Sequence, residues 1–250
     1  MPQEEARRSH SPEAIRERLQ SEPGQSYLKD FIYGAIDGAV TTFAVVASVA
    51  ATGLSSGIVI ILGLANLLAD GFSMAAGNFL GTRAENQSRD RAIRQEEDEI
   101  KSHPEGEREE VRQIFAAKGF EGKTLEEIVE VITSDNKRWV DTMITEEHGL
   151  SLSTPSAWRA AGVTYLAFIL VGAIPLITYV LEYFIPGTVA DPFWMAALLT
   201  GVAFFIVGAL KSRFVGKSWL LEGIETLSVG ALAAGIAYCI GLLLKPIVNG

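Results

Sequence analysis

The chain has 250 residues, of which 48% are hydrophobic and 20% are charged, and its formal net charge is −9. This acidic balance excludes proteins that hold nucleic acid through a basic surface, because like charges repel. The single cysteine, Cys239, excludes an intramolecular disulfide and a cysteine-based zinc cluster.

Residues 1–30 form a polar N-terminal segment that contains the stretch SPEAIRERLQSEPG. Ser11 can cap a helix, Pro12 suits its first turn, and Pro23-Gly24 would end it. We therefore expect a short amphipathic helix that lies on the cytosolic surface of a membrane.

Apolar residues then gather in separate blocks, at 31–53, 55–82, 158–184, 190–211 and 219–244. Each block reaches the roughly 20 residues that a helix needs to cross a hydrocarbon core of about 30 Å. The sequence therefore predicts an all-α membrane protein with five transmembrane helices. Two of them lie within residues 31–82 and three within residues 157–250. Pro175 is expected to kink the third helix.

An insertion of different character, residues 83–156, separates the second and third blocks. It holds 18 of the 30 acidic residues and 11 of the 21 basic residues of the chain. Its apolar positions recur at helical spacing, and Pro104, Gly119, Gly122 and Pro155 interrupt the pattern. These features predict a soluble, acidic, helical domain whose surface suits cations.

Basic residues near the membrane ends predict the orientation of the helices. They flank the first block and follow the fourth, as Arg7, Arg8, Arg16, Arg18 and Lys29 and then Lys211, Arg213 and Lys217. This distribution places the N-terminus and the insertion in the cytosol, and the C-terminus on the opposite side.

The first two apolar blocks carry polar side chains that are costly in a bilayer. They are Asp37 in the first block and a stripe at four-residue spacing in the second, Asn66, Asp70, Met74 and Asn78. A carboxylate at the centre of a membrane helix costs about 2.5–3.5 kcal/mol on insertion scales. Lysine or arginine partners are missing from the sequence at this depth, so Asp37 is a candidate for an ion pathway. The alternative is that the amides hydrogen-bond across helices and Met74 only packs.

Small residues accompany these polar side chains. Gly34 and Gly38 bracket Asp37, and a second stripe runs beside the polar one, as Ala65, Ala69, Ser73, Gly77 and Gly81. Small residues at this spacing let helix backbones approach closely. We therefore expect a tight polar interface inside the membrane.

The insertion carries paired glutamates on helix faces. Glu96 and Glu99 precede the break at Pro104, and Glu107 and Glu110 follow it at the same spacing. Two antiparallel helices would let the four carboxylates converge. Met143 and Glu147 lie four residues apart on a third helix. Oxygen ligands with one thioether suit Fe²⁺ or Mn²⁺, and less selectively Co²⁺ or Zn²⁺.

The alternative for this segment is an acidic surface that is exposed to solvent and binds no metal. Exposed histidines are common, so the pattern does not assign His103 or His148 as ligands.

The motifs of a nucleotide-driven pump and of a zinc metalloprotease are missing from the sequence. Gly216-Lys217-Ser218 resembles the end of a P-loop, but Lys211 stands where that motif needs glycine. The HExxH pattern is absent as well, and no Ser/His pair lies at membrane depth, because the apolar blocks contain no histidine. We therefore expect a protein that is not an enzyme and not a nucleotide-driven pump.

Three stretches, DGAVTTFAVVASVA, ANLLADGFSMAAGNFLGTRAE and WVDTMITEEHGL, resemble the vacuolar iron transporter family. The resemblance covers the chain from about residue 28 onwards. It implies a homodimeric, proton-coupled transporter that moves Fe²⁺ out of the cytosol. By position, the membrane residues of that family match Asp37 and Met74. Its cytosolic metal ligands match Glu96, Glu99, Glu107, Glu110, Met143 and Glu147.

Two positions depart from the family pattern. Asn66 replaces a glutamate of the characterised iron transporters, so that either Asp70 supplies the missing charge or selectivity and proton coupling differ. Ile144 replaces a second methionine, which predicts a cytosolic site that is less selective for soft ions.

The sequence thus leaves two hypotheses. The first is a homodimeric exporter of divalent metal, in the plasma membrane of a bacterium or the vacuolar membrane of a eukaryote. The alternative is a membrane-anchored metal sensor or store, whose insertion binds metal without transport.

Overall fold

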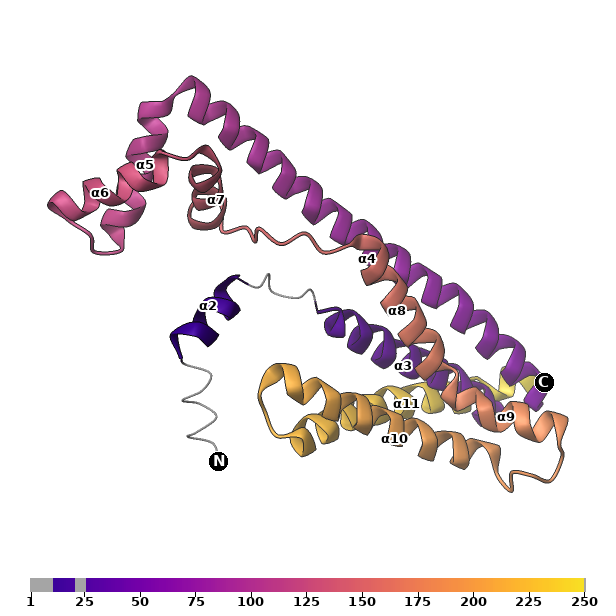
Figure 1. The fold of residues 1–250 in the computed structure, drawn as a ribbon. Helices are drawn as coiled ribbons and strands as arrows, with labels where there is room; N and C mark the ends of the chain where they lie inside the picture. Colours follow the sequence, from indigo (N-terminus) through magenta and orange to yellow (C-terminus); the bar gives the residue numbers. More distant parts are fainter. Residues whose placement is uncertain (1–10, 21–25, 250) are drawn as a thin grey trace.

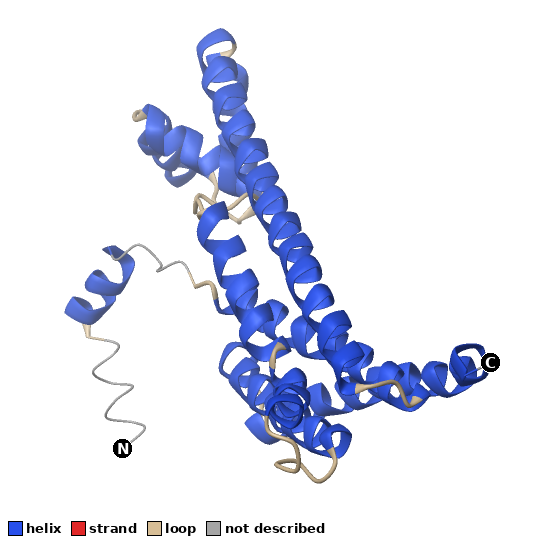
Figure 2. Cartoon of the chain, turned by 90° about the vertical axis from the view of Figure 1, so that its right-hand side faces the viewer, coloured by secondary structure: helices blue, strands red, loops and turns tan. Residues whose placement is uncertain are grey.

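The computed structural model describes residues 11–20 and 26–249. Within this part every regular element is an α-helix and no strand occurs (Figures 1 and 2). The short N-terminal helix α2 spans Pro12–Gln20, and Ser11 caps it by accepting a hydrogen bond from the backbone N–H of Ala14 at 3.2 Å. The predicted stop at Pro23-Gly24 and the basic residues Arg7 and Arg8 lie outside the described residues.

Four helices are long and apolar enough to cross a membrane. They are α3 (Leu28–Thr52), α4 (Ser56–Ser102), α10 (Pro192–Val215) and α11 (Trp219–Asn249). A fifth span results if α8 (Ala157–Gly172) and α9 (Ile174–Phe184) count as one bent helix. The two halves meet at 47°, and Pro175 stands in the first turn of α9. A proline removes one helical hydrogen bond, which explains the bend.

Helix α3 lies at the centre of the membrane helices and packs against α8 and α11 above all. Its contact with α8 depends on glycine. A Cβ atom on Gly34 would lie 2.3 Å from the carbonyl oxygen of Thr164, and one on Gly38 would lie 2.4 Å from that of Phe168. The predicted close approach at these two glycines is therefore confirmed, and the partner helix is α8.

Helix α4 buries a different face from the one that its small residues suggest. Its buried membrane positions are Val59, Gly63, Leu67, Gly71 and Ala75. The small stripe of Ala65, Ala69, Ser73, Gly77 and Gly81 is exposed in the single chain, and the space around Gly77 and Gly81 is open. The predicted close approach of another helix on this stripe therefore does not occur within one chain.

The same helix continues without a break into the insertion. At 47 residues and a rise of about 1.5 Å per residue it is about 70 Å long, more than twice the thickness of a hydrocarbon core of about 30 Å. Its second half is the first helix of the insertion. The expected boundary near residue 83 is thus a change of composition and not of backbone structure.

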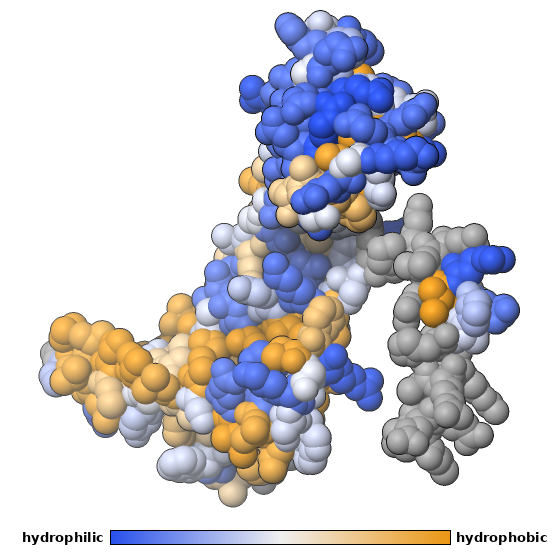
Figure 3. Space-filling view, turned by 90° about the vertical axis from the view of Figure 1, so that its left-hand side faces the viewer, coloured by the Kyte–Doolittle hydropathy of each residue, from blue (hydrophilic) through white to orange (hydrophobic). Residues whose placement is uncertain are grey.

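The insertion is completed by three short helices, α5 (Pro104–Ala117), α6 (Gly122–Thr133) and α7 (Asn136–Glu146). The predicted interruptions at Pro104, Gly119 and Gly122 delimit α5 and the start of α6, whereas the break between α6 and α7 was not predicted. The apolar faces of the three helices enclose a core with the end of α4, formed by Ile100, Val111, Val129, Ile132, Trp139, Val140, Met143 and Ile144. Figure 3 shows the result on one face of the molecule, where hydrophilic residues cover the insertion and hydrophobic residues cover the membrane helices.

An ion pair with a buried carboxylate joins the last two membrane helices near their turn. Lys211 of α10 contacts Glu222 of α11 at 2.8 Å, and Glu222 is only 2% exposed. Glu222 also lies in the first turn of α11, where a negative charge suits the positive end of the helix dipole. Figure 1 shows this turn on the same side of the membrane helices as the insertion.

Candidate metal site and membrane pathway

A cluster of acidic residues forms where α4, α5 and the segment after α7 meet. We call Glu96, Glu99, Glu107, Glu110 and Glu147, together with His148, the carboxylate cluster. Ligand atoms of Glu96, Glu147 and His148 all lie within 4.8 Å of one another. Electrostatic interactions connect these residues to Glu99, Glu107 and Glu110. The structure thus brings together the five glutamates that the sequence singled out.

Two members of the cluster are almost fully buried. Glu96 is 1% exposed and Glu107 is 6% exposed. The Oε1 atom of Glu96 accepts a hydrogen bond from His148 Nε2 at 2.8 Å. The Oε2 atoms of Glu96 and Glu107 are buried and have no hydrogen-bond partner among the described residues. Buried carboxylate oxygens without a donor are costly, and a bound cation would satisfy them.

Burial also raises the pKa values of glutamates in the cluster. Burial raises the pKa of Glu107 to about 7, and repulsion by Glu110, Glu96, Glu99 and Glu147 adds to the effect. Burial raises the pKa of Glu110, with added repulsion by Glu147, Glu96 and Glu99. Burial also raises the pKa of Glu96, with added repulsion by Glu147 and Glu99, although the hydrogen bond from His148 opposes this change. A divalent cation would reverse this repulsion by favouring the ionised carboxylates.

Met143 and Ile144 lie beside the cluster in the apolar core. Both are fully buried, and the Met143 carbonyl accepts the hydrogen bond from the backbone N–H of Glu147. Met143 therefore sits one turn before Glu147, as the sequence predicted. Its role as a sulfur ligand stays a prediction.

Sequence reasoning missed His148. The pattern gave no reason to prefer it over His103, which is exposed and contacts Ser102 at the corner between α4 and α5. The hydrogen bond to Glu96 joins residues 52 positions apart in the chain. Its place directly after Glu147 was the one available signal.

The segment from the cluster back to the membrane is tied to α4. Arg89, which is 7% exposed, donates to the carbonyl oxygen of Ser153 at 2.8 Å. Asn86 donates to the carbonyl oxygen of Pro155 at 2.9 Å, and the backbone N–H of Ser156 donates to the Tyr27 hydroxyl. These bonds fix how the insertion is joined to α8.

In the membrane helices, Asp37 of α3 and Asp70 of α4 lie within electrostatic range of each other. Both are half-buried, as are Asn66 and Met74. The side-chain nitrogen of Asn66 is buried and has no hydrogen-bond partner among the described residues. The polar stripe of α4 thus lies at the border between its buried face and its exposed small residues.

Met74 lines a cavity of about 410 Å³ at the start of α3. The polar residues of its lining are Lys29, Asp30, Tyr33, Asn78 and Thr164. Asn78 donates to Asp30 Oδ1 at 2.8 Å and to the Thr164 hydroxyl at 2.7 Å. The alternative of a hydrogen bond across helices is thus confirmed for Asn78. Sequence reasoning missed Asp30, although it precedes Asp37 by seven residues and so shares its helix face.

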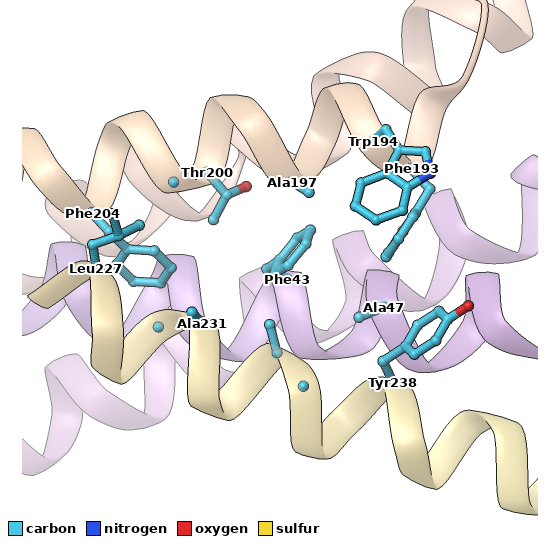
Figure 4. A pocket seen from close by; sticks show the side chains of 14 residues that line it. Phe43, Ala47, Phe193, Trp194, Ala197, Thr200, Phe204, Leu227, Ala231 and Tyr238 are labelled. Atoms are coloured by element: carbon cyan, nitrogen blue, oxygen red, sulfur yellow. The ribbon is translucent and has the colours of Figure 1, made fainter.

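A second cavity, of about 420 Å³, lies between α3, α10 and α11 (Figure 4). Phe43, Phe193, Trp194, Phe204 and Tyr238 surround it with rings, and small residues of α11 leave the space open. Aspartate, glutamate, lysine, arginine and histidine are absent from its lining. Its chemistry differs from that of the cavity beside Met74, and it offers no strong ligand for a metal ion.

Comparison with known proteins agrees with this arrangement. The model of the VIT family matches residues 28–242. Vacuolar iron transporter 1 of Arabidopsis thaliana is 32% identical over 219 residues, which cover 87% of this chain and 86% of the relative. The vacuolar iron transporter of Toxoplasma gondii is 31% identical over 258 residues, covering 98% of this chain and 85% of the relative. The names of both relatives describe transporters and not enzymes, and on these matches the chain belongs to the VIT family.

Proposed function

We propose that this protein is a membrane transporter that carries Fe²⁺ from the side of its insertion across the bilayer, in exchange for protons. The observation that carries the proposal is the continuity of α4. One helix bears Asn66, Asp70 and Met74 in its apolar half, and Glu96 and Glu99 in its polar half. A cation gathered at the carboxylate cluster is therefore held by the helix that also borders the membrane pathway. The names of the two relatives support iron as the cargo.

The donor set of the cluster fits a divalent transition metal. It offers carboxylate oxygens, two of them buried without a hydrogen-bond partner among the described residues, with the thioether of Met143 nearby. Oxygen-rich sites bind Mn²⁺ and Fe²⁺, whereas sulfur ligands favour softer ions. We expect Fe²⁺ as the main cargo and Mn²⁺ as a second one. We also expect the site to bind Co²⁺ and Zn²⁺, with less selectivity.

In the membrane, Asp37 and Asp70 form the charged part of the pathway. Two neighbouring carboxylates need counter-charge in an apolar setting. A metal ion supplies it during passage, and protons supply it when the ion has left. This alternation is what an exchanger requires, and Met74, with Asp30 in the same cavity, lies towards the insertion end.

A homodimer would complete this pathway. Ala65, Ala69, Ser73 and Gly77 form an exposed face of α4 next to its half-buried polar stripe. In a single chain, lipid would lie against the edge of this stripe. A second copy packed on the small residues would exclude lipid and bring a second set of ligands to the same crevice. By the basic-residue rule, the insertion faces the cytosol, and metal leaves the cytosol for the vacuole or the cell exterior.

The proposal is tested by Fe²⁺ flux into proteoliposomes under an imposed pH gradient, with Mn²⁺ in parallel. We expect gradient-dependent flux that falls at least about tenfold in Asp37→Asn, equivalent to about 1.4 kcal/mol. Glu225→Gln serves as the control, because Glu225 is 61% exposed beside Lys211. Metal bound at the cluster without flux in the native protein would favour a sensor or store and overturn the transporter.

A further inference from the structure

We propose that His148 is a nitrogen ligand of the metal ion at the carboxylate cluster, and that it makes this site prefer Fe²⁺ over the harder cations Mn²⁺, Mg²⁺ and Ca²⁺. The inference rests on the proposed function, since it requires that the cluster binds a divalent ion. Nε2 can bind an ion only after it has released its proton to solvent, so ligation would replace the hydrogen bond to Glu96 and give the cluster a mixed donor set of oxygen and nitrogen.

The geometry places the imidazole among the ligand atoms. His148 Nε2 lies 2.8 Å from Glu96 Oε1, and one ligand atom each of Glu96, Glu147 and His148 lie within 4.8 Å of one another. Two ligand atoms at right angles, each about 2.1 Å from an ion, are about 3 Å apart. The contact between His148 and Glu96 therefore already has the separation of two neighbouring ligands. The imidazole is 28% exposed, so an ion from solvent can reach it.

The buried oxygens of the cluster point independently to a cation. Glu96 and Glu107 are 1% and 6% exposed, and one oxygen of each has no hydrogen-bond partner among the described residues. His148 occupies only the other oxygen of Glu96. An ion bound by Glu96, Glu147 and His148 would therefore satisfy an oxygen that the imidazole itself leaves unpaired.

The consequence is a change in which metals are preferred. Carboxylates alone suit Mg²⁺, Ca²⁺ and Mn²⁺, whereas imidazole suits Fe²⁺, Co²⁺ and Zn²⁺ better. Ile144 contributes no ligand atom and is fully buried. His148 lies at the exposed rim of the same site. Its imidazole nitrogen can supply a donor softer than carboxylate, which Ile144 cannot provide.

The test uses the full-length protein in detergent, with Co²⁺ as the probe for X-ray absorption and with Fe²⁺ (without oxygen) and Mn²⁺ for calorimetry. The chain has three histidines, so His148→Gln is compared with His103→Ala. Glutamine can still donate to Glu96 but is a weak ligand, which separates ligation from positioning.

We expect imidazole scattering around Co²⁺ in the native protein and in His103→Ala, and its loss in His148→Gln. The Kd for Fe²⁺ should rise about tenfold or more in His148→Gln, and the Kd for Mn²⁺ by a clearly smaller factor. Unchanged scattering in His148→Gln, or an equal loss of affinity for both metals, would overturn the role as ligand while leaving the carboxylate site intact. Absence of any metal binding in the native protein would overturn both this inference and the proposed binding site.

Discussion

The carboxylate cluster of the insertion and the membrane carboxylates Asp37 and Asp70 are both acidic sites. They differ in how much of the surrounding protein one chain supplies. In the insertion, three segments bring five glutamates and His148 together, and a shared apolar core lies beside them. In the membrane, Asp37 and Asp70 are only half-buried, and the adjacent small face of α4 is exposed.

Water and lipid impose different requirements on a polar site. Water can cover the rim of the cluster, so one chain can build most of it by itself. Lipid offers no hydrogen bonds, so a half-covered carboxylate in a bilayer needs further protein around it. The membrane region is therefore expected to need a second copy where the insertion does not.

The largest expected effect concerns the glycines of the two helix faces. Gly38→Ala places a Cβ against the backbone of Phe168 at 2.4 Å, which should destabilise the membrane bundle by about 3 kcal/mol. Gly162→Ala in α8 is the control, since nothing lies within 4 Å of its added Cβ. Thermal unfolding of both variants in detergent is the measurement. Equal midpoints would contradict the assignment of the buried and exposed faces.

Replacing one buried carboxylate of the cluster tests whether the insertion forms a specific metal site. We expect Glu96→Gln to weaken Fe²⁺ binding by about 100-fold, or about 2.7 kcal/mol, because Glu96 is 1% exposed within the cluster. Glu105→Gln changes an exposed carboxylate in the first turn of α5 and should bind as the native protein does. Calorimetry without oxygen distinguishes the two, and a similar loss in both variants would indicate a diffuse acidic surface.

The metal-free insertion should lose stability as the pH rises. The pKa of Glu107 is raised from 4.5 to about 7, so the folded state holds its proton more tightly than the unfolded state does. The stabilisation is complete below about pH 4.5 and disappears as the pH rises through about 7. The full shift corresponds to about 3.4 kcal/mol, and solvent at the rim reduces the expected change to about 2 kcal/mol.

Hydrogen exchange of the α5 amides, corrected for intrinsic rates, would measure this change. Glu107→Gln should flatten the dependence, because glutamine does not titrate. Greater protection at pH 8 than at pH 5 in the metal-free protein would contradict the raised pKa of Glu107.

The smallest expected effect concerns the proposed dimer interface on α4. Gly77→Leu adds bulk to the exposed small face of α4 and should weaken dimerisation by about tenfold, or about 1.4 kcal/mol. Gly162→Leu makes the same change at an exposed glycine of α8 that also has open space around it. Sedimentation in detergent compares the two, and dimers of equal strength would exclude this face from the interface.

Much of the fold could be predicted because its signals are local. The apolar blocks, the breaks at Pro104, Gly119 and Gly122, and the bend near Pro175 all follow from backbone chemistry within a few residues. The pairing of Glu96 with Glu99 and of Glu107 with Glu110 follows from helical spacing alone. Convergence of these pairs needed only a turn between two antiparallel helices.

The rest depended on contacts between distant parts of the chain. Asn78 meets Asp30 across 48 positions, and His148 meets Glu96 across 52. Small residues on α4 indicate that the backbone of another helix can approach, but they do not indicate which helix. Within this chain, α8 packs against the other, buried face of α4. The helices, their membrane character and the acidic pairs could be predicted from the sequence, because these are properties of short segments. Which faces meet and which side chains share a site became known from the fold, since both depend on how separate helices pack.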